Sequence, residues 1–265
     1  MTRPDVHADM PQLIFQYAIG QQKPFTMRDE GHISACPFCD HSLLPPIRKR
    51  DGDILLVPNK YPILKGSDPF VLIETAECDS ELSLYTEDHL VRVFRMGFEA
   101  WYEMMDDKRY KSVLFLKNHG PYSGGSLRHP HMQLIGLFDI DYLTQIRREH
   151  FYGPVIYRAS GAELNISDHP RVGYTEFNIV LTDRKDFSIF CLLIQKAVQY
   201  ILKRHHGGLI GSYNLFFYLL DGLVYCKVMP RYATTPIFMG YSIPQVMDNL
   251  DSIVEEVRQY CFPSE

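Results

Sequence analysis

Two histidines and a glutamine, His129, His131 and Gln133, occupy alternate positions directly after a loop rich in glycine and serine. Side chains alternate across a strand, so these three would share one face of a strand that begins near His129. Backbone N–H groups of a Gly-Gly-Ser loop can form an anion site, and a neutral imidazole is a nucleophile near neutral pH. A single histidine on a strand is usually packed or solvated, but packing does not explain this whole pattern. We therefore predict a site for a phosphoryl group and a nucleophile.

The elements that position these residues in the first half can be read from hydrophobic periodicity. An apolar run at 112–116 predicts a buried strand before the loop, and Met132 and Leu134 would point from the second strand into a core. Apolar residues at helical spacing predict a core-facing helix from an N-cap at Thr86 to about residue 105. Earlier in the chain we expect a hairpin at 47–57 around Asp51-Gly52 and a strand at 70–75.

The second half repeats the order helix, strand, turn, strand. We expect a helix at 187–204 and then strands at 214–220 and 223–229, joined by the turn Asp221-Gly222. Charged residues 139–150 form a helix or a linker before this half, and further strands at 155–157, 163–166 and 175–181 and a last helix at 244–260 complete it. The second copy has no His-x-His, so we predict a duplication in which one half carries the chemistry.

Six cysteines in a chain of this length do not indicate a disulfide scaffold. Cys36 and Cys39 form a Cys-x-x-Cys pair, which can be a zinc knuckle, a redox pair or a chance occurrence. A redox pair usually opens a helix, whereas Asp40, His41 and two prolines follow here, so zinc is favoured. Three other cysteines lie in apolar surroundings and are expected in the core: Cys191, Cys226 and Cys261.

The segments Asn-x-Gly, Gly-x-Ser and His-Pro-His-x-Gln between Asn118 and Gln133 resemble the active-site segment of the galactose-1-phosphate uridylyltransferase family. That family belongs to the histidine-triad superfamily, which also includes ADP-glucose phosphorylase-like proteins and dinucleoside polyphosphate phosphorylases. The resemblance implies an α+β fold with two histidine-triad-like halves, each an antiparallel sheet with packed helices. We place a catalytic half with a zinc knuckle at 1–145 and a degenerate half at 146–265.

The resemblance also implies a metal site. In the family, the first histidine of His-Pro-His binds zinc, and a strand like the one that ends at Cys78 carries a further histidine ligand, here replaced by cysteine. Thiolate and imidazole both suit zinc, and we rank His89 below Cys78 as the third ligand. Four protein ligands leave no open position, so the zinc would be structural. The implied ligands are Cys36, Cys39, Cys78 and His129.

The remaining roles follow from the same resemblance. His131 would attack the α-phosphorus of a nucleoside diphosphate sugar, and Gln133 would hold the phosphate. Asn59 would contact the ribose or base, although it can also be read as a turn asparagine. Lys23 matches a basic residue near the nucleotide only loosely, and it receives no role. Asn118 would fix the loop or the phosphate. The implied phosphate-binding residues are Asn118, Gly124, Gly125 and Ser126.

The function implied is a nucleotidyltransferase that moves a nucleoside monophosphate to a phosphate acceptor through a nucleotidyl-histidine. One alternative is a nucleotide hydrolase or phosphorylase of the superfamily, and the hydrolases carry a third histidine where this chain has Gln133. Another alternative is a nucleotide-binding protein without turnover. The glutamine favours transfer, because no extra imidazole is present to activate water.

Composition limits the partners. The chain of 265 residues has 46% apolar and 22% charged residues, which is ordinary globular composition, and its formal charge of −5 gives no electrostatic case for nucleic acid. Residues 1–12 contain no apolar segment of signal-peptide length, and no apolar run approaches membrane-spanning length. We expect a soluble cytoplasmic protein that binds a nucleotide sugar and a phosphate acceptor, with a homodimer as an option.

Overall fold

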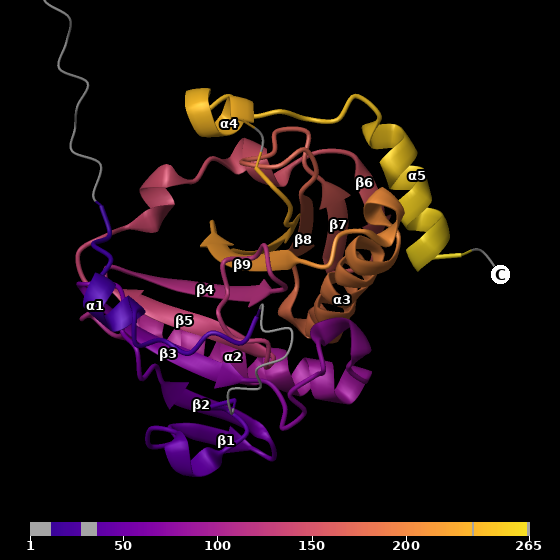
Figure 1. The fold of residues 1–265 in the computed structure, drawn as a ribbon. Coiled ribbons are helices and arrows are strands. Elements are labelled where there is room, and N and C mark those ends of the chain that lie inside the picture. Colours follow the sequence, from indigo (N-terminus) through magenta and orange to yellow (C-terminus); the bar gives the residue numbers. More distant parts are fainter. Residues whose placement is uncertain (1–11, 28–35, 235, 264–265) are drawn as a thin grey trace, which may run out of the picture.

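One antiparallel sheet organises the computed structural model, which describes residues 12–27, 36–234 and 236–263 (Figure 1). Within these residues the sheet has ten strands, in the order β1-β2-β3-β5-β4-β9-β10-β8-β7-β6. The strands of the first half are β1 Lys49–Asp51, β2 Ile54–Pro58, β3 Ser67–Ile73, β4 Ser112–His119 and β5 His131–Leu137. Those of the second half are β6 Val155–Arg158, β7 Ala162–Ile166, β8 Phe177–Leu181, β9 Tyr213–Leu220 and β10 Leu223–Pro230.

The strand order is the same in each half when it is counted outward from the middle of the sheet. On one side of the centre the strands follow in the order β4, β5, β3, β2, β1. On the other side the order is β9, β10, β8, β7, β6. The two central strands pair directly, with Leu116 opposite Phe216. The predicted duplication is therefore confirmed, and β4 and β9 join the two halves into a single continuous sheet.

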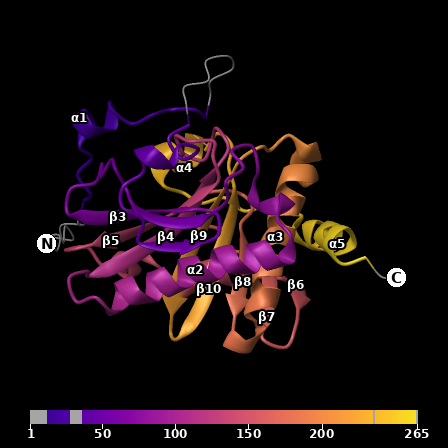
Figure 2. The same ribbon diagram turned by 90° about the horizontal axis from the view of Figure 1, so that it is seen from below.

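Two long helices cover one face of the sheet, α2 Glu87–Asp106 in the first half and α3 Phe187–Lys203 in the second (Figure 2). Thr86 caps α2 by accepting a hydrogen bond from the His89 N–H at 3.4 Å. Beneath the helices, Phe115 and Phe217 stack across the central strands with their rings 4.4 Å apart. The buried Trp101 donates from Nε1 to the Val113 carbonyl at 3.0 Å. A core of buried side chains from both halves results.

The opposite face of the sheet carries smaller apolar clusters. Leu55, Val57, Val71 and Ile73 pack with Phe38 in the first half. In the second half the corresponding cluster consists of Phe151, Val180, Tyr218 and Tyr225. Because side chains alternate, Leu116 and Gln133, paired across β4 and β5, also lie on this face. This face therefore presents the predicted site residues.

Several boundaries differ from the predictions. The last helix, α5 Leu250–Cys261, begins after Asn249 and not at Pro244, because its buried residues recur at helical spacing only from Ile253 onward. Two short helices, α1 Tyr17–Gly20 and α4 Pro236–Tyr241, were not predicted. The segment 139–150 forms two short 3₁₀ helices, Tyr142–Gln145 and Arg148–Phe151. Of the helices that the structure describes, none is long and apolar enough to span a bilayer.

Candidate functional site

Four side chains that are distant in sequence meet beside the start of β5. Donor atoms of Cys36, Cys39, Cys78 and His129 all lie within 4.8 Å of one another. His129 Nδ1 is 3.6 Å from the sulfur of Cys36 and 3.6 Å from that of Cys39. A tetrahedral zinc with Zn–S of about 2.3 Å and Zn–N of about 2.0 Å sets N and S roughly 3.5 Å apart. The donors and their spacing thus fit zinc, and the structure brings together the whole set proposed from the sequence.

The hydrogen bond of His129 Nε2 determines that Nδ1 is the nitrogen available to a metal. Nε2 donates to the Thr75 carbonyl at 2.8 Å, so Nδ1 of the neutral ring carries a lone pair toward the sulfurs. His129 is fully buried, and the Phe38 ring packs edge-on against it at 5.7 Å. His89 lies instead against Tyr85, with ring centroids 4.7 Å apart, and is not part of the cysteine cluster.

His131 begins β5 and is oriented by the backbone of its own strand. Its Nδ1–H donates to the His129 carbonyl at 2.8 Å, which leaves Nε2 with an unprotonated lone pair. The side chain is 7% exposed, and burial lowers the pKa of His131 to about 3, so the imidazole is neutral. Phe38 packs against this ring as well, at 5.4 Å, and links the cysteine turn to the histidine.

A pocket beside His131 is lined by residues from several separate segments of the first half. Gln133, Ser126 and Asn59 line it, with an apolar wall that includes Phe38. Asn59 also accepts a hydrogen bond from the Tyr61 N–H at 2.8 Å, so its oxygen is held in a turn, as the alternative reading expected.

Lys23 also lines this pocket, a position that the sequence indicated only loosely. Burial lowers the pKa of its ammonium group. The segment that carries it is tied down where Thr26 N–H donates to the Ser126 carbonyl at 2.8 Å. In the sequence, the only indication of this position is the dipeptide Lys23-Pro24, a basic residue before a proline. Such a dipeptide is too common to assign a role by itself.

The loop between β4 and β5 is held from within and from the second half. Gly120 has φ +81°, and a Cβ there would lie 2.1 Å from the Gly211 carbonyl oxygen, so only glycine fits. Ser123 Oγ donates to the Gly120 carbonyl at 2.7 Å and accepts from the Gly125 N–H at 3.2 Å. The loop conformation is thereby fixed without a ligand.

Asn118 supports this loop from below and does not line the pocket. Its Oδ1 accepts from Asn214 Nδ2 at 2.6 Å, and the same amide donates to the Ser123 carbonyl at 3.0 Å. Gly124 and Gly125 lie in the loop and, like Asn118, not on the pocket wall. Of the four implied phosphate-binding residues, Ser126 alone lines the pocket.

The second half has a different chemistry at the equivalent place. Gln133 lies opposite Leu116, Lys227 lies opposite Phe216, and Leu116 pairs with Phe216 across the centre of the sheet. Lys227 therefore lies as many strands from the central pair Leu116–Phe216 in the second half as Gln133 does in the first. Two residues earlier on these strands, the first half has His131 and the second has Tyr225.

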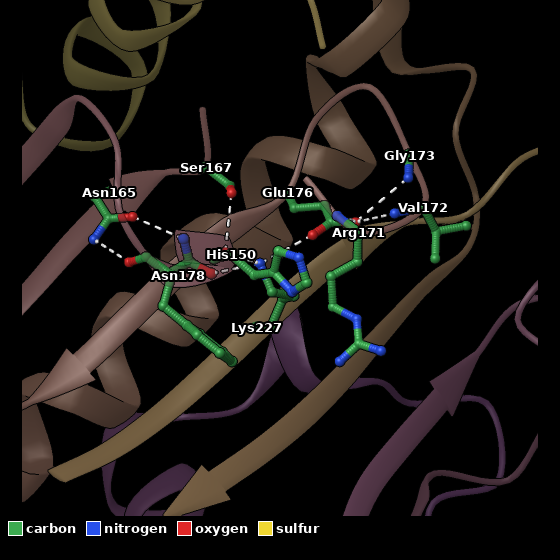
Figure 3. A network of polar contacts seen from close by, with 10 residues as sticks. His150, Asn165, Ser167, Arg171, Val172, Gly173, Glu176, Asn178 and Lys227 are labelled. Atoms are coloured by element: carbon green, nitrogen blue, oxygen red, sulfur yellow. Dashed lines mark hydrogen bonds and ion pairs between the residues drawn. The ribbon is translucent and has the colours of Figure 1, made fainter. Parts of the chain in front are cut away.

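Lys227 is the centre of a buried network (Figure 3). Its ammonium lies 2.9 Å from Glu176 Oε2 and donates to Asn178 Oδ1 at 2.8 Å and to the His150 carbonyl at 2.6 Å. Glu176 Oε1 accepts from the N–H groups of residues 171–173. Although burial raises the pKa of Glu176, Lys227 and these N–H groups outweigh burial and hold it below its usual value.

We expect Lys227→Met to destabilise the protein by about 3–5 kcal/mol, because it leaves the Glu176 carboxylate buried without its counter-ion. Chemical denaturation monitored by circular dichroism would measure the loss. Lys185→Met, at an exposed position, is the matched control and should change stability by less than about 0.5 kcal/mol. Equal effects of the two substitutions would contradict this account of the network.

The fold is similar to that of solved uridylyltransferase and phosphorylase structures. A uridylyltransferase mutant structure superposes with a TM-score of 0.69 at 14% identity, over 90% of this chain and 94% of that one. An ADP-glucose phosphorylase from Arabidopsis thaliana with bound ADP-glucose gives 0.64 at 16% identity, over 87% and 92%. At these identities the likeness shows the fold, and it confirms the predicted fold class.

Sequence comparison places the chain in a family. Models of the N-terminal and C-terminal domains of DUF4931, described as a domain of unknown function, match residues 15–140 and 143–262. The crystal structure of a DUF4931 family protein from Bacillus cereus ATCC 10987 is 40% identical, covers 81% of this chain and 99% of its own, and has a TM-score of 0.75. The chain belongs to the DUF4931 family.

One curated relative matches locally. A di-/tripeptide transporter from Lactobacillus helveticus is 25% identical over 103 residues, which is 39% of this chain. The chain spans about a fifth, 20%, of that relative's length, so we take nothing about transport from the match.

Proposed function

We propose that the protein is a nucleotidyltransferase that forms a covalent nucleotidyl intermediate on His131 and passes the nucleotidyl group to a phosphate acceptor. The observation that carries the proposal is the orientation of His131. Its Nδ1–H is committed to the His129 carbonyl, and the ring lines a pocket together with Lys23 and Gln133. A buried, neutral imidazole with one free lone pair beside a cation is what attack on a phosphate ester requires.

The reaction proceeds in two displacements. Nε2 of His131 attacks the α-phosphorus of a nucleoside diphosphate sugar, an N–P bond forms, and the P–O bond to the sugar phosphate breaks. An oxygen of the acceptor phosphate then attacks the same phosphorus, and the N–P bond breaks. The ring gains positive charge when the N–P bond forms, and the His129 carbonyl stabilises it through the Nδ1–H.

In this proposal the nucleoside end of the donor lies against the pocket, which at about 50 Å³ holds only part of it. Its wall includes Phe38, Leu44 and Val57, which can cover a base, while Asn59 at the rim can meet the ribose. Lys23 and Ser126 lie where they can donate to phosphate oxygens. The bound ADP-glucose of the similar Arabidopsis phosphorylase supports a nucleotide sugar as donor.

The cysteine cluster serves a structural purpose in this proposal. Cys36, Cys39, Cys78 and His129 would fill all four positions of a zinc ion, which would then clamp the cysteine turn to the strand that presents His131. Phe38, inside that turn, is held against the nucleophile as a result. Zinc binding requires reduced thiols, so we place the protein in the cytoplasm.

The direct test is to mix the protein with nucleoside diphosphate sugars, one at a time, and to measure its intact mass. The proposal expects one donor to add the mass of one nucleoside monophosphate. Adding a phosphate acceptor should then remove it. A full panel of bases and sugars that gives no adduct, with zinc-loaded protein, would contradict the proposal.

Gln133→His is expected to shift the balance from transfer toward hydrolysis. The hydrolase branch of the superfamily carries a third histidine at this position, and a further imidazole beside the phosphorus can activate water. The measurement is the ratio of free nucleotide to transferred product at a fixed acceptor concentration. Gln133→Asn, which has an amide but no imidazole, is the control. An unchanged ratio in a folded, active Gln133→His variant would argue against this role.

A further inference from the structure

A second cavity lies on the same face of the sheet as His131, over β4, β9 and β10. Its volume is about 470 Å³, which is large enough for an organic molecule. Its floor is apolar and aromatic, and two arginines, Arg171 and Arg231, line it. We name this cavity the central groove; its floor residues include Leu114, Leu116, Phe216, Tyr218 and Met229. Among the described residues that line it there is no aspartate or glutamate.

The central groove begins next to the candidate site. Leu116, on its floor, is the direct cross-strand partner of Gln133, which lines the first pocket. Neighbouring strands are about 4.8 Å apart, so one molecule can extend from one cavity into the other. The groove crosses from the first half to the second at the pair Leu116–Phe216.

A chain of hydrogen bonds connects Arg231 to the loop beside His131. Arg231 Nη1 donates to Asn214 Oδ1 at 2.7 Å. Asn214 Nδ2 donates in turn to Asn118 Oδ1 at 2.6 Å and to the Ser123 carbonyl at 3.0 Å. Asn118 and Asn214 are direct partners across the central strands. The guanidinium is therefore held in place, on the side of the loop that faces the second half.

The charges in the central groove are uncompensated. The backbone N–H of Arg171 donates to Glu176 Oε1 at 2.9 Å, but neither guanidinium group, of Arg171 or of Arg231, forms an ion pair with a carboxylate in the part of the chain that the structure describes. Both side chains are partly buried, and burial lowers the pKa of Arg231. Two guanidinium groups that share a cavity without an acidic side chain favour an anionic ligand, and guanidinium matches phosphate geometry well.

The floor of the central groove indicates what organic part the anionic ligand has. Phe216 and Met229 offer apolar contact, and the polar side chains beside them are few, chiefly Tyr142 and Gln145. A hexose lying there would leave most of its hydroxyl groups without partners, which is costly. Inorganic phosphate alone would leave the apolar floor unused. The groove suits a phosphate ester with an aromatic or aliphatic body.

We infer that the central groove binds the acceptor of the transfer, and that this acceptor is an organic phosphate whose phosphate is held by Arg231 and whose apolar body lies on Phe216. The role of this ligand as an acceptor rests on the proposed transfer reaction. The chemical class of the ligand rests on the central groove alone. The second half would thus supply substrate contacts, although it has no His-x-His on its last strand.

Calorimetry on the full, zinc-loaded chain tests the inference without turnover. The probes are phenyl phosphate, inorganic phosphate, phenol and glucose 1-phosphate. We expect phenyl phosphate to bind at least about tenfold more tightly than each of the others, because it alone has both a phosphate and an apolar ring. Arg231→Met and Phe216→Ala should each lower the affinity for phenyl phosphate by about tenfold or more.

A matched control is Arg184→Met, since Arg184 packs over Tyr102 on the helix-covered side at 5.1 Å. Two results would overturn the inference. One is an affinity for phenyl phosphate no higher than that for inorganic phosphate. The other is an affinity for phenyl phosphate that is the same in Arg231→Met and Phe216→Ala as in the wild type. If Arg231→Met fails to fold, Arg171→Met replaces it. A chain that forms no adduct with any donor, yet binds phenyl phosphate through Arg231, would refute the proposed transfer and support the ligand class.

Discussion

His131→Asn is expected to abolish both the nucleotidyl adduct and the transfer reaction. The substitution removes the nucleophile while it keeps a polar side chain of similar size beside His129. The loss in kcat/KM should be several powers of ten, because the remaining phosphate contacts cannot replace covalent catalysis. Initial rates at several acceptor concentrations, together with intact mass after donor alone, would measure it. The wild type should give parallel double-reciprocal lines, as ping-pong kinetics require.

Two comparisons make this test specific. Ser126→Ala removes one side-chain hydroxyl from the same pocket and should reduce the rate by about 10²–10³-fold or less, with the adduct still forming. Metal content and thermal stability of His131→Asn should match the wild type, because His131 is not among the four clustered donors. A folded, zinc-loaded His131→Asn variant that keeps near-normal transfer would refute the covalent mechanism.

Cys78→Ala is expected to lose zinc and most of the stability that zinc provides. The donors of Cys78 and of the other three residues come from three segments that are distant along the chain, and a bound metal contributes its binding energy directly to folding. We expect a metal content near one zinc per chain in the wild type and well below half of that in the variant. The melting temperature should fall by several degrees or more. Plasma emission spectrometry and thermal unfolding would give the two values.

The control for this experiment is Cys261→Ala. Cys261 is a buried cysteine of α5 that donates to the Lys196 carbonyl at 3.5 Å, so its loss tests a thiol outside the cluster. It should cost some packing energy and leave the zinc content unchanged. A wild type without zinc, or a Cys78→Ala variant with full zinc beside a His89→Ala variant without it, would contradict the ligand assignment.

The features that the sequence predicted well are those encoded locally. Alternation over residues 129–135 indicated a strand starting near His129; the strand β5 begins at His131, so it carries His131 and Gln133 while His129 precedes it. The repeated order of helix, strand, turn and strand indicated the duplication. The cysteine set came from matching Cys78 to a family position, and its donors do gather around His129. These features can be recognised from sequence because they depend on residues a few positions apart or on a known motif.

The features that the sequence did not predict depend on contacts between distant residues. Asn118 was expected to fix the loop or the phosphate; it supports the loop through Asn214, which is 96 residues away, and nothing local marks that partner. Lys227 reads as an ordinary strand residue until Glu176 is placed against it. The start of α5 was misplaced because Pro244 is a general helix signal, while the true start depends on which side chains pack on α3.

The pairing of β4 with β9 has a consequence for how the chain is made. A ribosome releases β4 roughly a hundred residues before β9, so during synthesis the first half has an exposed strand edge with no partner. That edge runs through Phe115 and Leu116, which are apolar on both faces. Pairing over such a sequence distance is slow. The nascent chain therefore depends on a chaperone, or on fast release of the second half, to keep β4 from pairing with another chain.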